Sequence, residues 1–176
     1  MKLFFTLFII TTSYSTFGQK KSPPDFNCYR YSKFSPKQKQ QYYPFNTTSK
    51  VVFVSFEESE SELNYKNKSV GDFKFKEVKI LETSQIDSLI DLLYNISVKG
   101  NVFKFTPRSC YSPRNAILFL NSKNKIFEFI ELCFECYRTR TSSPQINDGI
   151  ACDQKFNLIR AYFKKQGIQY GTDNGL

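Results

Sequence analysis

Residues 115–134 read NAILFLNSKNKIFEFIELCF and carry the clearest strand pattern of the chain. It holds two apolar runs, 115–120 and 126–134, which are separated by the polar residues 121–125. Short apolar runs joined by a polar turn predict the two antiparallel strands of a β-hairpin. Both faces of the second run carry apolar side chains, so we expect the hairpin to lie in the middle of its sheet.

Three further strands are predicted upstream of this hairpin. The run VVFVSF at 51–56 is apolar and β-branched and is bounded by polar residues, which is typical of a buried strand. Residues 72–81 alternate between apolar and charged side chains, with a change of parity near Lys76 that indicates a β-bulge. Residues 102–106, VFKFT, form the third predicted strand.

Two helices are predicted from apolar residues that recur at helical spacing. The first begins at Ser84, the start of an S-x-x-D capping box, and ends near Asn95. The second begins near Asp153 and ends before Gly167, where a glycine suits a left-handed C-cap. Together these elements predict a single α+β domain over residues 51–170. It consists of an antiparallel sheet of four to five strands with two helices on one face.

Residues 1–18 are predicted to be a secretory signal peptide. Lys2 gives it a positive start, residues 3–10 give it an apolar core, and Thr16 and Gly18 are the small residues before the cleavage site. The apolar core is far shorter than the roughly 20 residues that a transmembrane helix needs, and no later segment approaches that length. We therefore expect an exported protein, periplasmic or secreted, with no transmembrane span.

Residues 19–50 are predicted to form a basic, partly disordered arm that also contains aromatic residues. The arm has seven basic residues and one acidic residue, and so carries most of the formal charge of +9. Such a segment can bind a polyanion. Because export argues against nucleic acid, the expected partner is an anionic polymer of the cell envelope or another envelope protein. The candidate anion contacts are Arg30, Lys33, Lys37 and Lys39 in the arm and Arg114 outside it. Residues 171–176 are predicted to be a loose C-terminus.

The chain has no histidine and five cysteines. The missing histidine excludes Ser-His-Asp and Cys-His catalysis as well as His-ligated metal sites. A non-enzymatic protein is therefore favoured, and no cofactor is expected. Export favours disulfides over thiols. An odd number of cysteines leaves at least one without a partner in the same chain.

The register of the hairpin predicts one disulfide. If Leu120 pairs with Ile126, Cys110 lies opposite Cys136, at the roughly 5 Å that separates directly opposed strand residues. Pro113 interrupts the ladder of hydrogen bonds and can shift this register.

The other cysteines leave alternatives open. Cys133 would face the other side of the sheet and could bond with Cys152 or Cys28. We expect Cys28, which lies in the arm, to be the free thiol. Cys133-x-x-Cys136 can also be a redox dithiol, although it ends a strand and does not begin a helix. A zinc site that uses Cys110, Cys133, Cys136 and Cys152 is a third possibility.

Arg114 directly follows Pro113, which fixes the chain before it. It can hold an anionic ligand near the cysteines or pair with a carboxylate, Glu131 or Glu135. Pairing with a carboxylate is the favoured interpretation.

The segments Cys110-Tyr-Ser-Pro-Arg114 and Cys133-Phe-Glu-Cys136 resemble a pattern, C-Y-x-P-R followed by C-F-x-C, found in uncharacterised small exported proteins of Bacteroidota. The signal ending at Gly18 is similar too. The resemblance implies that the two segments belong to one unit, and it carries no activity over. The sequence thus predicts an exported, disulfide-stabilised, non-enzymatic binding or structural protein of the cell envelope. A CxxC thiol protein built on Cys133 and Cys136, redox-active or zinc-binding, is the alternative.

Overall fold

The structure is a computed structural model of the chain. It describes residues 26–31, 35, 38, 41–57, 65–99, 110–150 and 152–173. The predicted signal peptide and the predicted strand at 102–106 lie outside the described residues, as do Lys33, Lys37 and Lys39.

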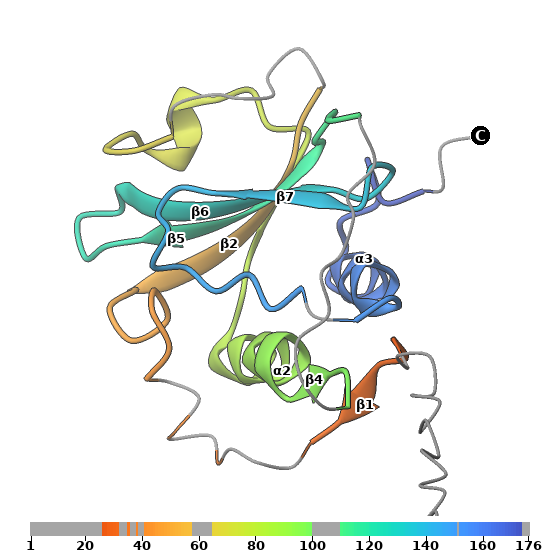
Figure 1. Cartoon of the computed structure of the whole chain (residues 1–176). Coiled ribbons are helices and arrows are strands. Elements are labelled where there is room, and N and C mark those ends of the chain that lie inside the picture. Colours follow the sequence, from red (N-terminus) through yellow and green to blue (C-terminus); the bar gives the residue numbers. More distant parts are fainter. Residues whose placement is uncertain are drawn as a thin grey trace, which may run out of the picture.

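Five antiparallel strands form the main sheet, in the order β3-β2-β5-β6-β7 (Figure 1). Their bounds are β2 Lys50–Ser55, β3 Glu77–Ile80, β5 Asn115–Leu120, β6 Ile126–Cys133 and β7 Arg138–Thr141. The predicted hairpin is β5–β6, and it lies inside the sheet because β2 and β7 flank it. Strand β7 was not predicted, since its sequence RTRT contains no apolar residue.

The register of the hairpin matches the prediction only at its turn. Leu120 pairs with Ile126, but the next pair is Phe119 with Glu128, so a β-bulge shifts the register by one residue. Residues before Asn115 leave the ladder, as Pro113 suggested. The position of Cys110 is therefore set by a loop and not by strand pairing.

Both helices, α2 (Thr83–Tyr94) and α3 (Lys155–Lys165), lie on one face of the sheet, which confirms the predicted arrangement (Figure 1). Their starts differ from the prediction by one or two residues. Helix α2 has Glu82 as its N-cap, and the Glu82 backbone N–H donates to the Gln85 side chain at 2.8 Å. Helix α3 has Gln154 as its N-cap in place of Asp153.

The helix ends agree with the sequence. Asn95 caps α2, and Gly167 follows α3 with a φ of +91°, a value that favours glycine. Within the described part of the chain, no helix is both long and apolar enough to cross a membrane.

Each face of the sheet packs its own core. On the helix face, Phe53 and Phe163 stack with ring centroids 3.9 Å apart. On the opposite face, the segment 65–75, which contains the short 3-10 helix η2 (Val70–Asp72), covers Val52, Val54 and Leu118. Phe73 and Phe75 pack down into this second core. For this reason the predicted strand at 72–81 is regular only over Glu77–Ile80.

The domain extends beyond its predicted limits at both ends. Strand β1 (Tyr29–Arg30) pairs with β4 (Ile96–Ser97), and Phe45 joins the helix-face core. These parts of the predicted arm therefore pack against the domain. At the other end, Thr172 is buried and Asp173 pairs with Lys164, so residues 171–173 are also part of the folded unit.

Candidate functional site

The described cysteines form two disulfides. Cys110 bonds with Cys136, the predicted pair, with their Cα atoms 5.5 Å apart. Cys28 bonds with Cys152, with their Cα atoms 5.1 Å apart. The prediction that Cys28 is the free thiol was wrong, and the free cysteine is Cys133.

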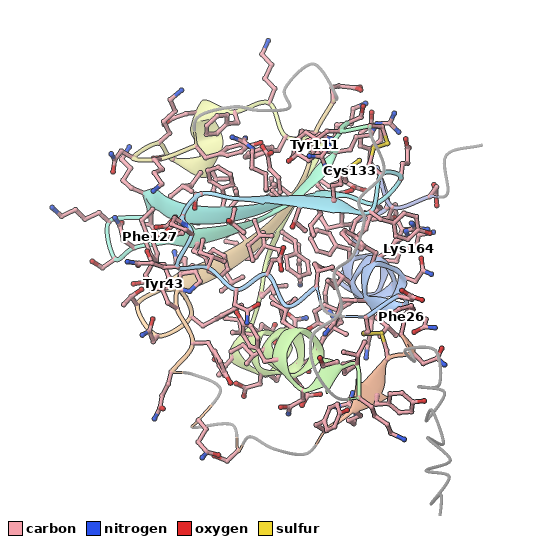
Figure 2. The ribbon with its side chains drawn as sticks, viewed as in Figure 1. Phe26, Tyr43, Tyr111, Phe127, Cys133 and Lys164 are labelled. Carbon is pink, nitrogen blue, oxygen red and sulfur yellow. A yellow bond between two sulfur atoms is a disulfide. The ribbon has the colours of Figure 1, made fainter. Side chains whose placement is uncertain are left out.

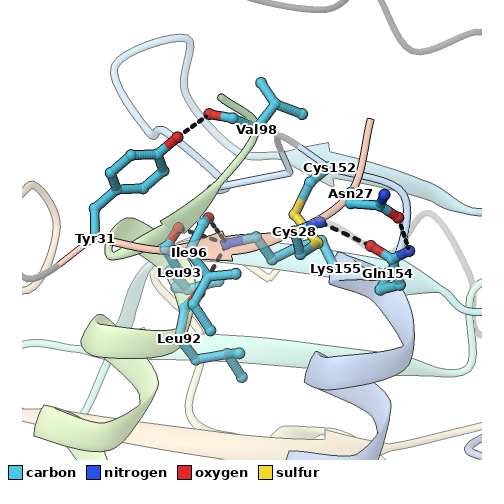
Figure 3. The surroundings of a disulfide bond; sticks show 10 residues. All are labelled: Asn27, Cys28, Tyr31, Leu92, Leu93, Ile96, Val98, Cys152, Gln154 and Lys155. Carbon is cyan, nitrogen blue, oxygen red and sulfur yellow. Dashed lines mark hydrogen bonds between the residues drawn. A yellow bond between two sulfur atoms is a disulfide. The ribbon is translucent and has the colours of Figure 1, made fainter. Parts of the chain in front are cut away.

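The second disulfide follows from the docking of the N-terminal segment. Pairing of β1 with β4 brings residues 26–31 beside the start of α3. There the Cys28 backbone N–H donates to Gln154 Oε1 at 2.9 Å, and the Asp153 N–H donates to the Phe26 carbonyl at 3.1 Å. These contacts hold Cys28 against Cys152, at the head of the last helix (Figure 3).

Cys133 lies at the end of β6, on the face of the sheet opposite the helices (Figure 2). Its side chain is only 1% exposed. The sulfur accepts hydrogen bonds from the backbone N–H groups of Ser112 at 3.4 Å and Cys136 at 3.3 Å. The thiol lies beside the Cys110–Cys136 disulfide, and burial separates it from solvent.

The structure forms neither the Cys133–Cys136 dithiol nor the four-cysteine zinc site. Cys136 is bonded to Cys110, so Cys133 and Cys136 do not form a dithiol. Cys152 is bonded to Cys28, so the four-cysteine zinc set is divided. The described residues contain no group of three or more His, Cys, Asp or Glu that could hold a metal ion.

Thiol counting tests this arrangement. We expect an alkylating reagent to modify one cysteine per chain after unfolding without reductant, and peptide mapping to identify it as Cys133. In the native protein we expect the same reagent to react at least tenfold more slowly, because Cys133 is buried. Modification of Cys28 in the unfolded, unreduced protein would contradict the Cys28–Cys152 bond.

A buried carboxylate lies two residues before the free cysteine. Glu131 is 0% exposed and accepts hydrogen bonds from Arg140 Nε and Nη2, each at 2.7 Å, and from the Tyr111 hydroxyl at 2.8 Å. Burial raises the pKa of Tyr111 and of Tyr65, and the Glu131 carboxylate raises both further. The paired charges and the tyrosines fix β7 and the loop that carries Cys110. This carboxylate therefore has a structural role, since it joins β6, β7 and the loop that carries Cys110.

The predicted anion contacts are neutralised where the structure describes them. Arg114 pairs with Glu135 at 2.8 Å, one of the two carboxylates that the sequence offered. Arg30 pairs with Asp91 of α2. Neither residue is thus an open anion site.

Lys155 is a buried cation that sequence analysis missed. Its side chain is 0% exposed, and its Nζ donates to the carbonyl oxygens of Leu92 at 2.7 Å, Leu93 at 3.0 Å and Ile96 (Figure 3). It thereby satisfies carbonyl groups at the C-terminus of α2, where the helix dipole favours a cation. Burial lowers the pKa of Lys155 to about 8. The sequence pattern gave no signal for this residue. A lysine in an amphipathic helix is expected on the exposed face, whereas Lys155 lies on the buried side of α3.

A second missed feature is a group of six lysines, which we call the lysine surface. It surrounds η2 and the β5–β6 turn, and it consists of Lys50, Lys66, Lys68, Lys74, Lys123 and Lys125. Backbone hydrogen bonds between Ile126 and residues 67 and 68, both 2.8 Å, hold the two segments together. Lys125 Nζ donates to Ser69 Oγ at 2.9 Å, and Lys50 Nζ donates to Asn124 Oδ1 at 2.8 Å.

Among the described residues, few carboxylates balance the lysine surface. Asp72 is the only acidic residue in the sequence from 65 to 76. Glu128, which is buried, lies 3.5 Å from Lys66. Lys74 and Lys123 are exposed, and none of the described residues pairs with either of them. The described residues of this face therefore carry an excess of positive charge.

The surface hollows formed by described residues include a groove and a smaller pocket. A groove of about 530 Å³ runs between α2 and α3, and residues of both signs line it, including Asp87, Asp91 and Lys165. A smaller pocket of about 260 Å³ lies between η2 and β3, beside the lysine surface, and its lining is mainly apolar. The mixed charges of the groove between α2 and α3 give it no preference for an anion. The pocket between η2 and β3 has Lys50 as the one charged residue in its lining.

Comparison with known proteins adds no relative to this description. The chain matches no protein-family model, no curated protein and no solved structure.

Proposed function

We propose that this protein is an exported, disulfide-stabilised, non-enzymatic binding protein of the cell envelope, and that its partner is anionic. The observation that carries the proposal is the lysine surface on a domain closed by two disulfides. Disulfides persist in oxidising compartments, which supports export of the chain with residues 1–18 as its signal peptide.

The lysine surface supports the anionic partner. Its charges lie on one side of the domain, where they produce a positive potential that attracts and orients a negatively charged molecule. Of the predicted anion contacts, Lys33, Lys37 and Lys39 lie outside the described residues. Arg30 and Arg114 would not contribute to this contact, because each already has a carboxylate partner.

The buried groups support a binding role over catalysis. Cys133 and Glu131 lie near the Cys110–Cys136 disulfide and are 1% and 0% exposed. A substrate therefore cannot reach either side chain without a rearrangement. The exposed side chains described on this face include the lysines, Asp72, and the aliphatic residues Val78 and Ile80.

A retention experiment tests the proposal on protein purified from the exported fraction, with its N-terminus at Gln19. The triple variant Lys68→Gln, Lys74→Gln, Lys123→Gln is compared with wild type on immobilised poly-glutamate. Each lost surface ion contact contributes about 0.5 kcal/mol, so we expect about tenfold weaker binding that becomes weaker still as salt rises.

The control is a second triple variant, Lys79→Gln, Lys99→Gln, Lys165→Gln, which has the same net charge but keeps the lysine surface. We expect it to bind like wild type. Equal losses in both triple variants would show that only total charge matters and would contradict the assigned surface. Recovery of the protein solely from the cytoplasm, with residues 1–18 still attached, would contradict export.

A further inference from the structure

Within the described part of the chain, the outer edge of β3 is an open strand edge. β3 is the first strand in the sheet order, so of the described strands only β2 pairs with it. The Leu81 N–H donates to the Val51 carbonyl at 2.9 Å, and Phe53 is opposite Lys79, so the odd-numbered residues direct their backbone groups toward β2. The backbone N–H and C=O groups of Val78 and Ile80 consequently point outward. None of the described residues bonds to them.

The side chains of the same two residues are exposed on the face opposite the helices. Val78 is 49% exposed and Ile80 is 55% exposed. They form one side of the pocket of about 260 Å³ whose other walls include Val70 and Leu120. An apolar hollow thus lies directly beside unpaired backbone donors and acceptors.

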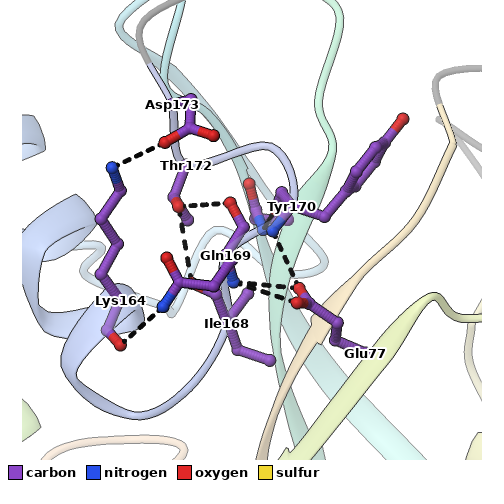
Figure 4. A network of polar contacts seen from close by, with 8 residues as sticks. Glu77, Lys164, Ile168, Gln169, Tyr170, Thr172 and Asp173 are labelled. Atoms are coloured by element: carbon purple, nitrogen blue, oxygen red, sulfur yellow. Dashed lines mark hydrogen bonds and ion pairs between the residues drawn. The ribbon is translucent and has the colours of Figure 1, made fainter.

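Contacts with the C-terminal segment hold β3 at its first residue. The backbone N–H groups of Gln169 and Tyr170 donate to the Glu77 carboxylate at 3.0–3.2 Å (Figure 4). The Ser55 hydroxyl also donates to this carboxylate, at 2.7 Å. With β2 on one side and these contacts at its start, β3 is a fixed edge. A partner would therefore not have to order it.

The charge around the pocket restricts the kind of partner. Lys50 lines the pocket, and Lys125 is bonded to Ser69, which lines it as well. A second copy of this chain would bring its own lysines to the edge and be repelled. An acidic segment would be attracted instead.

We propose that the β3 edge binds an extended acidic peptide segment of another protein. The segment adds a strand to the sheet through Val78 and Ile80 and places an apolar side chain in the pocket. Addition of a strand uses backbone hydrogen bonds for affinity and pockets for alternate side chains for specificity, and both features meet here. This inference rests on the proposed function, because it names the anionic partner and its place on the protein.

The test uses the oxidised mature protein and a short, end-blocked, fluorescent peptide of alternating glutamate and valine. Ile80→Pro removes one outward N–H and keeps every hydrogen bond to β2, since proline fits an edge strand when its missing N–H faces solvent. We expect it to weaken binding of this peptide about fivefold. The double variant Val78→Thr, Ile80→Thr keeps β-branched side chains but removes apolar surface, and we expect about a fivefold loss there too.

The control variant is Leu158→Gln, which removes an exposed apolar side chain from α3, and it should bind the peptide like wild type. Poly-glutamate of equal charge should bind wild type at least tenfold more weakly than the peptide, and Ile80→Pro should not change that binding. Thermal unfolding of each variant checks that the fold is retained.

Three results would overturn the inference, and they are distinguishable. If poly-glutamate binds as tightly as the peptide and Ile80→Pro changes neither, strand addition is wrong while the anionic partner remains. If neither probe binds wild type, the proposed function fails as well. If wild type forms a dimer that Ile80→Pro abolishes, the edge belongs to a second copy of the chain.

Discussion

Replacement of Cys28 and Cys152 together by alanine is expected to lower the free energy of unfolding by about 4 kcal/mol. The two residues are 124 positions apart, so their bond closes a loop of most of the described domain. In the chain-entropy account, a cross-link that closes a loop on the order of 100 residues stabilises a fold by about 4–5 kcal/mol. Loss of this bond also removes the covalent link between the β1 segment and α3, so residues 26–31 would be held only by non-covalent contacts, such as the short β1–β4 pairing and the Arg30–Asp91 ion pair.

Urea unfolding of the oxidised double variant measures this effect. The matched comparison is Cys110→Ala with Cys136→Ala, whose bond spans 26 positions. In the same account this smaller loop is worth about 3 kcal/mol, so we expect the Cys28–Cys152 variant to lose more stability. The opposite order would show that local packing, and not loop length, determines what each disulfide contributes.

The sequence predicted those parts of the fold that have a regular period. Strands β5 and β6 are long enough for apolar residues to dominate both faces, and α2 shows an apolar stripe at helical spacing. By contrast, β1 and β4 are two residues each, which is too short for any period. They exist because the β1–β4 pairing and the Cys28–Cys152 bond bring distant segments together.

Strand β7 illustrates a signal that was present but not used. Its arginines and threonines are typical of an exposed loop, whereas Arg140 in fact pairs with the buried Glu131. An acidic residue inside the apolar run of β6 needs a buried cationic partner, since an unpaired buried carboxylate is costly. The presence of Glu131 in that run could therefore have predicted a basic strand beside it.

The candidate site was predicted less completely than the fold. The Cys110–Cys136 pair was found because it spans a single hairpin, whereas the partner of Cys28 depends on contacts over more than a hundred residues. The lysine surface gave no signal in the net charge, because residues 51–176 contain 17 basic and 15 acidic residues, so the lysines of residues 65–76 are offset by acidic residues elsewhere in the chain.

Replacement of Lys155 by methionine is expected to lower the free energy of unfolding by about 3 kcal/mol at pH 7. Methionine preserves most of the aliphatic stem but leaves the buried carbonyl groups of Leu92, Leu93 and Ile96 without their donor. A buried polar group that loses its partner costs about 1–3 kcal/mol, and hydrogen bonds to charged groups lie at the upper end of this range. Lys165→Met is the matched control, since that side chain is exposed on the same helix, and it should change stability by less than about 0.5 kcal/mol.

The stability difference between wild type and Lys155→Met should also depend on pH. Burial lowers the pKa of Lys155 to about 8 in the folded chain, against about 10.5 for a lysine in the unfolded chain. Between these two values the unfolded state binds more protons, so the stability of wild type rises with pH relative to the variant. We expect the difference to increase by about 2 kcal/mol from pH 7 to pH 10 and to be constant below pH 7. Both proteins should carry Cys133→Ala, because a free thiolate would exchange with the disulfides at high pH. A difference that falls as pH rises would mean that the three carbonyl groups outweigh burial and hold the pKa of Lys155 above that of an ordinary lysine.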